Sequence, residues 1–445
     1  MHRSLARRSV AAVAAAGWMS TLAAAQTPPS EPPPDAPLDF YAAEPDLRGY
    51  VDEALERTPT VLESRARYRA ARERVPQVTA LPDPVVSFTQ ALRSLETRVG
   101  PQTNAVTLSQ DFPWIGTLDL QGRVALQQAA AQYHLHQARR RDIVAQVKQA
   151  FYELAYVDAA LGLAHEERLL LEHYETLART RYATGQGLQQ AVIKLQAEIT
   201  RIINRRHVLD RQRLTRAAHL NALRDRPAQD PVPTIRPLAQ RPVDLDRAQL
   251  YELGHRHREE LQAAAALVRG SERSIELARM RSRPSFTASV GVLNVGRRDD
   301  AAGVALPPPD NGRNAVTVSL GVSLPLWRGK YRAGVEQAAA ELLAHRHQRA
   351  AARNAMERGV QDALVRLETL DRQVELLDTV LIPQTEEALR ATEAAYETGQ
   401  LAVLDLLDSE RMLIEIRLLR ARYVSDSLIA LGDLERAVGM RVTEN

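Results

Sequence analysis

The sequence predicts a mainly α-helical protein in which long antiparallel helical hairpins carry four short β-strands of membrane-spanning length. Three observations lead to this fold class. Aromatic residues are only 4% of the 445 residues, and the abundance of Ala, Leu, Arg, Glu and Gln is typical of long packed helices. Four segments instead alternate apolar and polar side chains with period two. Helices and alternating segments also follow one another in the same order twice, which indicates an internal duplication.

The N-terminus has the features of a secretory signal peptide. A basic start with Arg3, Arg7 and Arg8 precedes a short apolar run, and small residues precede Gln26. We therefore expect residues 1–25 to be removed; a membrane anchor is the weaker alternative, because the run is short and poor in large apolar side chains. Export removes three arginines from a formal net charge of +3, so charge gives no reason to expect nucleic acid binding. The chain has no Cys, which excludes disulfides, Cys-ligated metals and a lipidated cysteine.

Two copies of one pattern make up the rest of the chain. Pro113 and Pro325 are 212 positions apart, and Tyr182 of Y-A-T-G-Q and Tyr396 of Y-E-T-G-Q are 214 apart. Each copy contains a helix, two strands and a long helical hairpin. The predicted organisation is a signal peptide (1–25), a Pro-rich leader (26–46), a first repeat (47–224), a Pro-rich linker (225–245), a second repeat (246–440) and a C-terminal tail (441–445).

The elements follow from breaker residues and period. In the first repeat we expect helices over 47–78, 116–182 and 188–224, and strands over 85–92 and 104–112. In the second we expect helices over 246–283, 331–396 and 403–438, and strands over 285–295 and 315–324. No segment of 18 or more apolar residues follows the N-terminal run, so a transmembrane helix is not expected.

The strand over 315–324 is the clearest. Apolar residues from Val316 to Leu324 alternate with Thr317, Ser319, Gly321 and Ser323. Such a strand is long enough to cross a bilayer when tilted; a half-exposed sheet of a soluble domain is the alternative. Four strands cannot close a barrel, whereas two chains supply eight and three supply twelve. The small polar row suits a water-filled lumen, which favours three chains.

Pro and Trp mark the positions where strand pattern changes to helix pattern. Pro113 and Trp114 follow the second strand, and Pro325 and Trp327 follow the fourth. Pro ends a hydrogen-bonded ladder, and Trp is enriched at membrane interfaces. We interpret these residues as strand–helix junctions at the membrane surface; core packing of the two Trp side chains is the alternative.

These features resemble one family. The duplication, the four strands, the Y-x-x-G phrases and the phrases L-P-D-P-V-V-S-F (81–88) and S-Q-D-F-P-W-I-G (109–116) resemble TolC-type outer-membrane efflux proteins, and more narrowly their heavy-metal subgroup. The resemblance implies long helical hairpins that form a periplasmic α-barrel, with the four strands contributing to a trimeric 12-stranded outer-membrane β-barrel. It also places the linker in the equatorial region of the periplasmic part.

The resemblance further implies a passive exit duct in the Gram-negative outer membrane. Its expected partners are two further copies of the chain, outer-membrane lipid, a periplasmic adaptor protein and an inner-membrane pump of the resistance-nodulation-division type, with no cofactor and no nucleic acid. Heavy-metal cations are the first expectation for the substrate, and drugs or other small molecules the second. The competing hypothesis is a soluble periplasmic coiled-coil adaptor or structural protein.

The breaks in the two hairpins correspond, by this resemblance, to the periplasmic tips where the adaptor docks. The implied docking residues are Tyr182, Gly185, Gln186, Gly399 and Gln400.

A gate is implied at the second tip, with Tyr396, Asp405 and Asp408 as its residues. Three copies of the two carboxylates would form an electronegative constriction; ordinary first-turn carboxylates, favoured by the helix dipole, are the alternative. Leu401 replaces an Arg that is frequent in the family, and Ala191 occupies the equivalent acidic position of the first copy.

Other motifs do not support chemistry. The pairs His134/His136, His255/His257 and His345/His347 are two residues apart, so on a helix each pair diverges by about 200° and cannot chelate one ion; solvated side chains are expected. The Gly-Lys of 329–330 lacks the spacing of a phosphate loop. Nothing resembles a catalytic motif, and we expect no enzyme activity.

Overall fold

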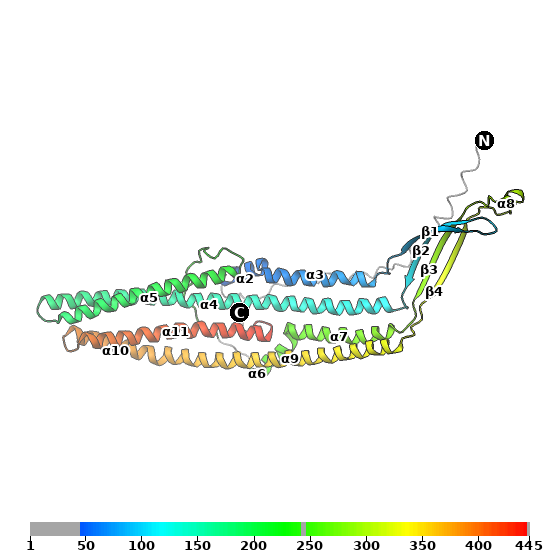
Figure 1. The fold of residues 1–445 in the computed structure, drawn as a ribbon. Helices are drawn as coiled ribbons and strands as arrows, with labels where there is room; N and C mark the ends of the chain where they lie inside the picture. The colour runs from blue at the N-terminus through cyan, green and yellow to red at the C-terminus, as the bar shows by residue number, and fades with distance from the viewer. Residues whose placement is uncertain (1–44, 242–245, 443–445) are drawn as a thin grey trace.

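The computed structural model describes residues 45–241 and 246–442 as an elongated layer of helices that ends in a β-sheet (Figure 1). The first repeat contains α2 (Pro45–Arg57), α3 (Pro59–Thr79), β1 (Val85–Leu95), β2 (Gln102–Phe112), α4 (Thr117–Ala183) and α5 (Gln189–Ala222). The second contains α6 (Arg247–His257), α7 (Glu259–Met280), β3 (Phe286–Val295), α8 (Ala301–Ala305), β4 (Ala315–Val322), α9 (Arg328–Leu376), the π-helical turn η1 (Leu377–Leu381), α10 (Ile382–Glu397) and α11 (Val403–Val438). The predicted mainly helical fold with four strands is confirmed. The predicted signal peptide and residues 26–44 of the leader lie outside the described residues.

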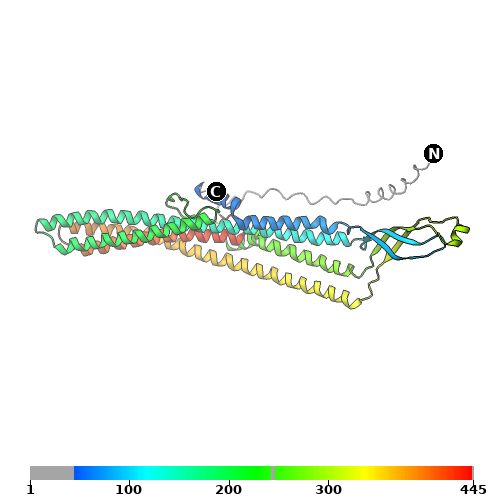
Figure 2. The same cartoon turned by 45° about the horizontal axis from the view of Figure 1, so that its top comes forward.

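The helices and strands follow one spatial order. Near the sheet, α3 packs on α4, α4 on α7, and α7 on α9, and the strands follow in the order β1-β2-β3-β4. Each of these helices is adjacent in sequence to one strand: α3 to β1, α4 to β2, α7 to β3 and α9 to β4 (Figure 2). Towards the tips the neighbours are α5, α4, α11 and α10. The single chain is therefore one curved layer with two edges, formed by α3 and β1 on one side and by α9 and β4 on the other.

The antiparallel register places like side chains on one face of the sheet. Val318 of β4 pairs with Val290 of β3, which pairs with Leu108 of β2. Thr317 and its partner Gly291 occupy the opposite face, and the β1–β2 pairing continues the apolar row to Val86 and the small polar row to Ser87. The apolar row and the small polar row predicted for single strands thus extend across the sheet.

Two expected helices are each divided, which corrects the sequence prediction. In the first repeat the division lies at Thr58, because the following Pro59 lacks an N–H and disfavours helical backbone before it. The Thr58 hydroxyl lies 2.6 Å from the carbonyl oxygens of Ala54 and Leu223, at the end of α5.

The second division, at Arg258, has no Pro that could predict it from the sequence. Arg258 takes an extended backbone between α6 and α7. There the end of α11 passes close by, and a Cβ on Gly439 would come within 2.6 Å of the His257 carbonyl oxygen. The expected helix over 246–283 is therefore interrupted by a tertiary contact. In each repeat, the break faces the C-terminal end of that repeat's last helix.

The long helix of the second repeat begins at Arg328, three residues before the expected start, and contains η1 before Pro383. Pro cannot donate to the carbonyl four residues earlier and its ring crowds that carbonyl, so a widened turn accommodates it.

The core divides along the rod. Two apolar clusters fill the middle, around Phe151 and Val360, and a third lies towards the tips, around Leu171 and Leu406. Val147 and Val360, matched in the duplication, are both fully buried. Among the described residues, no helix combines the length and the apolar character needed to cross a bilayer.

Candidate functional site at the helical tips and strand–helix junctions

The first strand–helix junction is closed within the chain. The Trp114 ring lies parallel to that of Phe286 at 6.1 Å between centroids, and the Arg283 guanidinium lies 5.8 Å from the Trp114 ring centre. β2 ends at Phe112, immediately before Pro113. The junction therefore joins β2 to the start of β3 and the end of α7.

The second junction is open. Trp327 is 76% exposed, and its neighbours Leu324 and Leu326 are 70% and 72% exposed. Pro325 lies between the end of β4 and the start of α9, at the edge of the layer. Trp114 therefore packs partly against its own chain, as the core-packing alternative expects, whereas Trp327 does not in the single chain.

The first tip is a tight turn between α4 and α5. Gly185 has φ +77°, its N–H donates to the Tyr182 carbonyl at 3.1 Å, and the Gln186 N–H donates to the Arg181 carbonyl at 2.9 Å. This is a helix-ending motif that places glycine in the left-handed region.

The second tip repeats this geometry. Gly399 has φ +79°, its N–H donates to the Tyr396 carbonyl at 3.0 Å, and the Gln400 N–H donates to the Ala395 carbonyl at 2.9 Å. The duplicated phrases therefore encode the same backbone turn, and both turns lie at the end of the rod opposite the sheet (Figure 1).

The side chains around the two turns differ. Tyr182 is 48% exposed, whereas the matched Tyr396 is 5% exposed. The Arg181 guanidinium lies 4.7 Å from the centre of the Tyr396 ring and also donates to the Glu397 carbonyl. Burial raises the pKa of the Tyr396 hydroxyl, and the nearby Arg181 opposes that shift. One arginine therefore connects the first hairpin to the second at the tip.

The two predicted gate carboxylates have different local roles. Both Asp405 and Asp408 are exposed, on the face of α11 opposite Leu406 and Leu407. The Asp405 carboxylate accepts the Ala402 N–H at 3.1 Å, which caps the start of α11. Asp408 has no such bond; its carboxylate lies 3.8 Å from the guanidinium of the following turn's arginine. Capping therefore accounts for Asp405 but not for Asp408, and their gate role stays a prediction.

Two carboxylates that sequence reasoning missed, the buried Asp158 and the half-buried Asp371, hold the linker against the helices. Asp158 on α4 accepts from Arg213 at 2.6 Å and from the Ile235 N–H at 2.8 Å. Asp371 on α9 accepts from Gln240 at 2.9 Å. The signal was present, because Asp158 and Asp371 are 213 positions apart and so occupy matched positions of the duplication.

The histidine pairs are not all solvated, which corrects the expectation. His136 is 2% exposed, and its Nδ1 lies 2.7 Å from the Ser64 hydroxyl. In the second repeat His345 Nδ1 lies 2.6 Å from the Ser271 hydroxyl. These repeated contacts join neighbouring helices. Within residues 45–241 and 246–442, no three His, Asp or Glu side chains are placed to hold a metal ion.

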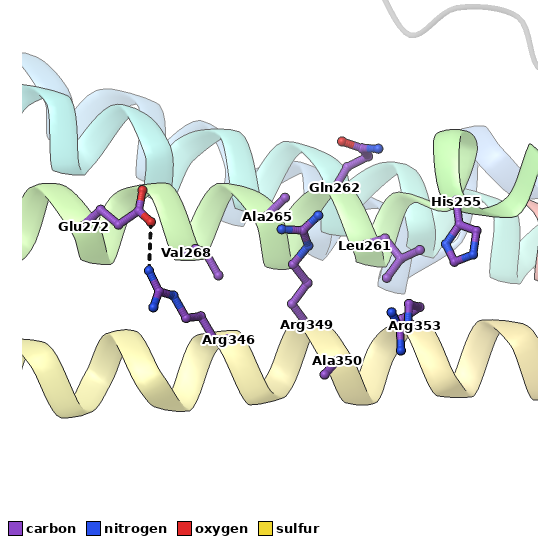
Figure 3. A pocket seen from close by; sticks show the side chains of 10 residues that line it. All are labelled: His255, Leu261, Gln262, Ala265, Val268, Glu272, Arg346, Arg349, Ala350 and Arg353. Carbon is purple, nitrogen blue, oxygen red and sulfur yellow. Dashed lines mark hydrogen bonds and ion pairs between the residues drawn. The ribbon is translucent and has the colours of Figure 1, made fainter. Parts of the chain in front are cut away.

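A groove of about 620 Å³ runs between α7 and α9, away from the tips and junctions (Figure 3). Arg346, Arg349 and Arg353 of α9 line one side, and Arg346 pairs with Glu272 across it at 3.4 Å. None of the residues predicted from the sequence for the tips, gate or junctions lines this groove.

The second repeat matches a known protein family. The model of the family described as "Outer membrane efflux protein" matches residues 250–440. No curated protein matches significantly. The match lies within the predicted second repeat (246–440).

Solved structures match nearly the whole chain. A membrane protein from Pseudomonas aeruginosa is 21% identical, with a TM-score of 0.73 over 93% of this chain and 100% of that one. The outer membrane protein VceC from Vibrio cholerae is 19% identical, with a TM-score of 0.72 over 89% and 96%. The open-state outer membrane channel MtrE of Neisseria gonorrhoeae is 21% identical, with a TM-score of 0.71 over 90% of each chain.

These matches define a class of fold: helical hairpins joined to four antiparallel strands, as in outer-membrane channels. The family model matches within the second repeat, and the solved structures show that nearly the whole chain shares their fold. The expectation that the chain is not an enzyme agrees with this family and with these channels.

Proposed function

We propose that this chain is the outer-membrane channel of a tripartite efflux system in a Gram-negative bacterium, with a large periplasmic portion. The observation that supports it best is the open layer. Strands and helices share one spatial order, the sheet has one apolar and one small polar face, and neither edge strand has a second strand neighbour among the described residues.

Closure of this layer requires further copies. Strands of 8 to 11 residues match the thickness of a tilted membrane strand. In hydrocarbon the unpaired N–H and C=O groups of β1 and β4 would be costly, so the edges must pair. Three copies give twelve strands with the polar rows facing a lumen wide enough for water. Trp327 would then lie at the membrane interface, where exposed Trp is favoured.

Electron microscopy of the protein extracted from outer membranes in detergent tests this proposal. We expect a three-fold tube longer than about 100 Å, since α4 alone has 67 residues at about 1.5 Å per residue, with a micelle at one end. A monomer without a micelle would contradict the channel and favour the competing hypothesis of a periplasmic coiled-coil protein.

The entrance is proposed at the tips. Tyr182, Gly185, Gln186, Gly399 and Gln400 would form the adaptor-docking surface. Tyr396, Asp405 and Asp408 would form the gate, with the exposed carboxylates of three copies attracting cations.

Single-channel recording tests the gate. Replacing Asp405 and Asp408 by Ala is expected to lower cation selectivity. The matched control removes two exposed carboxylates far from the tips, Glu56 and Glu63, and should leave selectivity unchanged. Equal selectivity in all three proteins would mean that Asp405 and Asp408 act only at the start of a helix.

The substrate is proposed to be heavy-metal cations, delivered by a periplasmic adaptor and a resistance-nodulation-division pump. The support is the resemblance of residues 81–88 and 109–116 to the heavy-metal subgroup. A deletion strain that still expresses the pump should be more sensitive to copper, silver, zinc, cobalt or cadmium. Unchanged sensitivity to all five, with increased sensitivity to drugs, would assign the channel to drug efflux. N-terminal sequencing of the mature protein is expected to start at Gln26.

A further inference from the structure

The tip half of the layer buries charged side chains within its apolar cluster. Glu410 on α11 is 1% exposed and Glu167 on α4 is 5% exposed. Around them lie the leucine and isoleucine side chains of the third apolar cluster, including Leu195 and Leu406. Buried carboxylates are costly unless a positive charge or hydrogen-bond donors compensate them.

Arg205 and Arg411 are the guanidinium groups that act electrostatically on Glu410, but each forms an ion pair with another carboxylate. The Arg205 guanidinium pairs with Glu167, and the Arg411 guanidinium pairs with Glu198. The Oε1 atom of Glu410 is buried and has no hydrogen-bond partner among the described residues. At the contact of α4, α5 and α11, Glu167 and Glu198 therefore each have a guanidinium partner, whereas Glu410 keeps a buried oxygen without a hydrogen bond.

The other charged or titratable groups around this cluster do not supply the missing donor. The Tyr174 hydroxyl donates to Glu393 of α10. Further charges come from each helix packed there: Arg201 on α5, Glu397 on α10, and Asp408 and Glu415 on α11. Of these, only Arg201 is positive, and it is 69% exposed and paired with Glu198.

A proton can supply what the cluster lacks. Burial raises the pKa of the Glu410 carboxyl to about 7; Arg205 and Arg411 oppose the shift, and Glu198 adds to it. Protonation removes the uncompensated charge, and the resulting O–H can donate to a neighbouring carboxylate. The group thus changes charge near neutral pH, which an exposed glutamate does not do.

We propose that Glu410 is a proton-binding site that controls how tightly the α4–α5 hairpin packs on the α10–α11 hairpin. With the proton bound, the hairpins pack closely and the two tips lie together. Without it, the buried carboxylate weakens the contact and the tips separate. The description of this movement as opening of a channel rests on the proposed function; the proton site does not.

The direction of the pH effect follows from the folded and unfolded values. Glu410 binds its proton more tightly in the packed hairpins than in the unfolded chain, where the ordinary value of 4.5 applies. Packing is therefore stabilised fully below that value, and the stabilisation is lost as pH rises through about 7. The tips are closest in mild acid and furthest apart in mild base.

The duplication provides the test variant. The position matched to Glu410 in the first repeat, 214 residues earlier, is Gln196, which donates to Glu175 at 3.0 Å. Glu410→Gln keeps the size and a hydrogen-bond donor but cannot ionise. Glu415→Gln is the matched control, because Glu415 lies on the same helix and is exposed.

The chain has no native Cys, so a pair of labels can be introduced without side reactions. Gln186→Cys and Gln400→Cys place one spin label on each exposed tip. The full-length protein is diluted with unlabelled chain so that an oligomer carries at most one labelled copy. The distance between labels is then measured by electron spin resonance from about pH 5 to about pH 9.

In the otherwise unchanged protein and in Glu415→Gln, we expect the label distance to increase with a midpoint near pH 7. In Glu410→Gln the short distance should persist across the range. A constant distance in the unchanged protein, a midpoint near 4.5, or an unaltered transition in Glu410→Gln would overturn the proposal. The first two outcomes are measured with Glu410 unchanged, so they do not depend on whether Glu410→Gln folds.

This test separates the two proposals. A tube without pH-dependent tips would retain the channel and remove the proton site. A particle that forms no tube, yet whose tips separate near neutral pH, would retain the proton site and remove the channel.

Discussion

The middle of the rod and its tip half use the same helices, α4 and α11, but treat buried charge differently. In the middle, Lys148 and Glu435 are 7% and 4% exposed in their side chains and pair at 2.5 Å. Asp158 has both a guanidinium and a backbone N–H. In the tip half, by contrast, the buried Glu410 has a carboxylate oxygen with no hydrogen-bond partner among the described residues.

The difference indicates where the molecule can move. A balanced buried pair holds two helices in one arrangement, because separating the partners leaves a buried charge without its counter-charge. A buried carboxylate with an unsatisfied oxygen, such as Glu410, gains little from close packing once its proton leaves. The middle therefore serves as a fixed support, and the tip half as the part whose packing changes.

The largest expected effect comes from breaking the balanced pair. Lys148→Met leaves Glu435 buried without its cation, and we expect a loss of about 3–5 kcal/mol in stability. The drop should appear in thermal unfolding of the detergent-purified protein. The control is the double variant Lys148→Met/Glu435→Leu, which removes both charges and should recover most of the loss. Equal losses in the single and double variants would mean that packing, not charge balance, governs this contact.

The linker anchors give a smaller effect and compare the two repeats. Asp158→Asn removes the charge that binds Arg213 and weakens the bond to the Ile235 N–H, at an expected cost of about 1.5–3 kcal/mol. The matched change Asp371→Asn loses only neutral partners and should cost about 1 kcal/mol.

Hydrogen exchange is the measurement for these variants. Exchange should rise in residues 225–241 for Asp158→Asn and stay unchanged at both tips. Faster exchange at the tips would show that the middle and the tip half are not independent.

The connection between the tips is weaker still. Arg181→Ala removes the contact with the Tyr396 ring and the bond to the Glu397 carbonyl, and we expect about 0.5–1 kcal/mol. Because this contact joins the two hairpins, label distances between the tips should lengthen at every pH. Arg179→Ala, on the same helix and 65% exposed with a partner within its own helix, is the control and should leave the distances unchanged.

The smallest effect distinguishes the two exposed carboxylates of the second tip. Asp405→Asn weakens the bond to the Ala402 N–H at the positive end of α11, which should cost about 0.3–1 kcal/mol. Asp408→Asn has no such bond to lose and should leave stability within about 0.3 kcal/mol. Chemical denaturation of both variants measures the difference; identical values would show that Asp405 is not a cap.

Local signals in the sequence were sufficient for several features. The period-two rows located the four strands, and only their ends shifted. Gly185 and Gly399 marked both tips, because a left-handed backbone at a helix end is a property of a few consecutive residues. The constant offset between the copies revealed the duplication. Pro59 also carried the signal for the first helix break.

Other features depended on elements distant in the chain. The break at Arg258 exists because the end of α11 packs against it. Glu410 stood among Leu406, Leu407 and Leu413 at helical spacing, so its burial could be predicted from the pattern. The ion pairs of Arg205 with Glu167 and of Arg411 with Glu198 could not.

The sequence by itself determined the elements, their order and the turns, because hydrogen bonding along the backbone and side-chain period act over a few residues. Only the tertiary structure decided which charges are balanced, why Tyr396 is buried while Tyr182 is exposed, and which junction is closed. Those properties depend on which helix lies beside which, and identical local motifs acquire different surroundings because the two repeats have different neighbours in the layer.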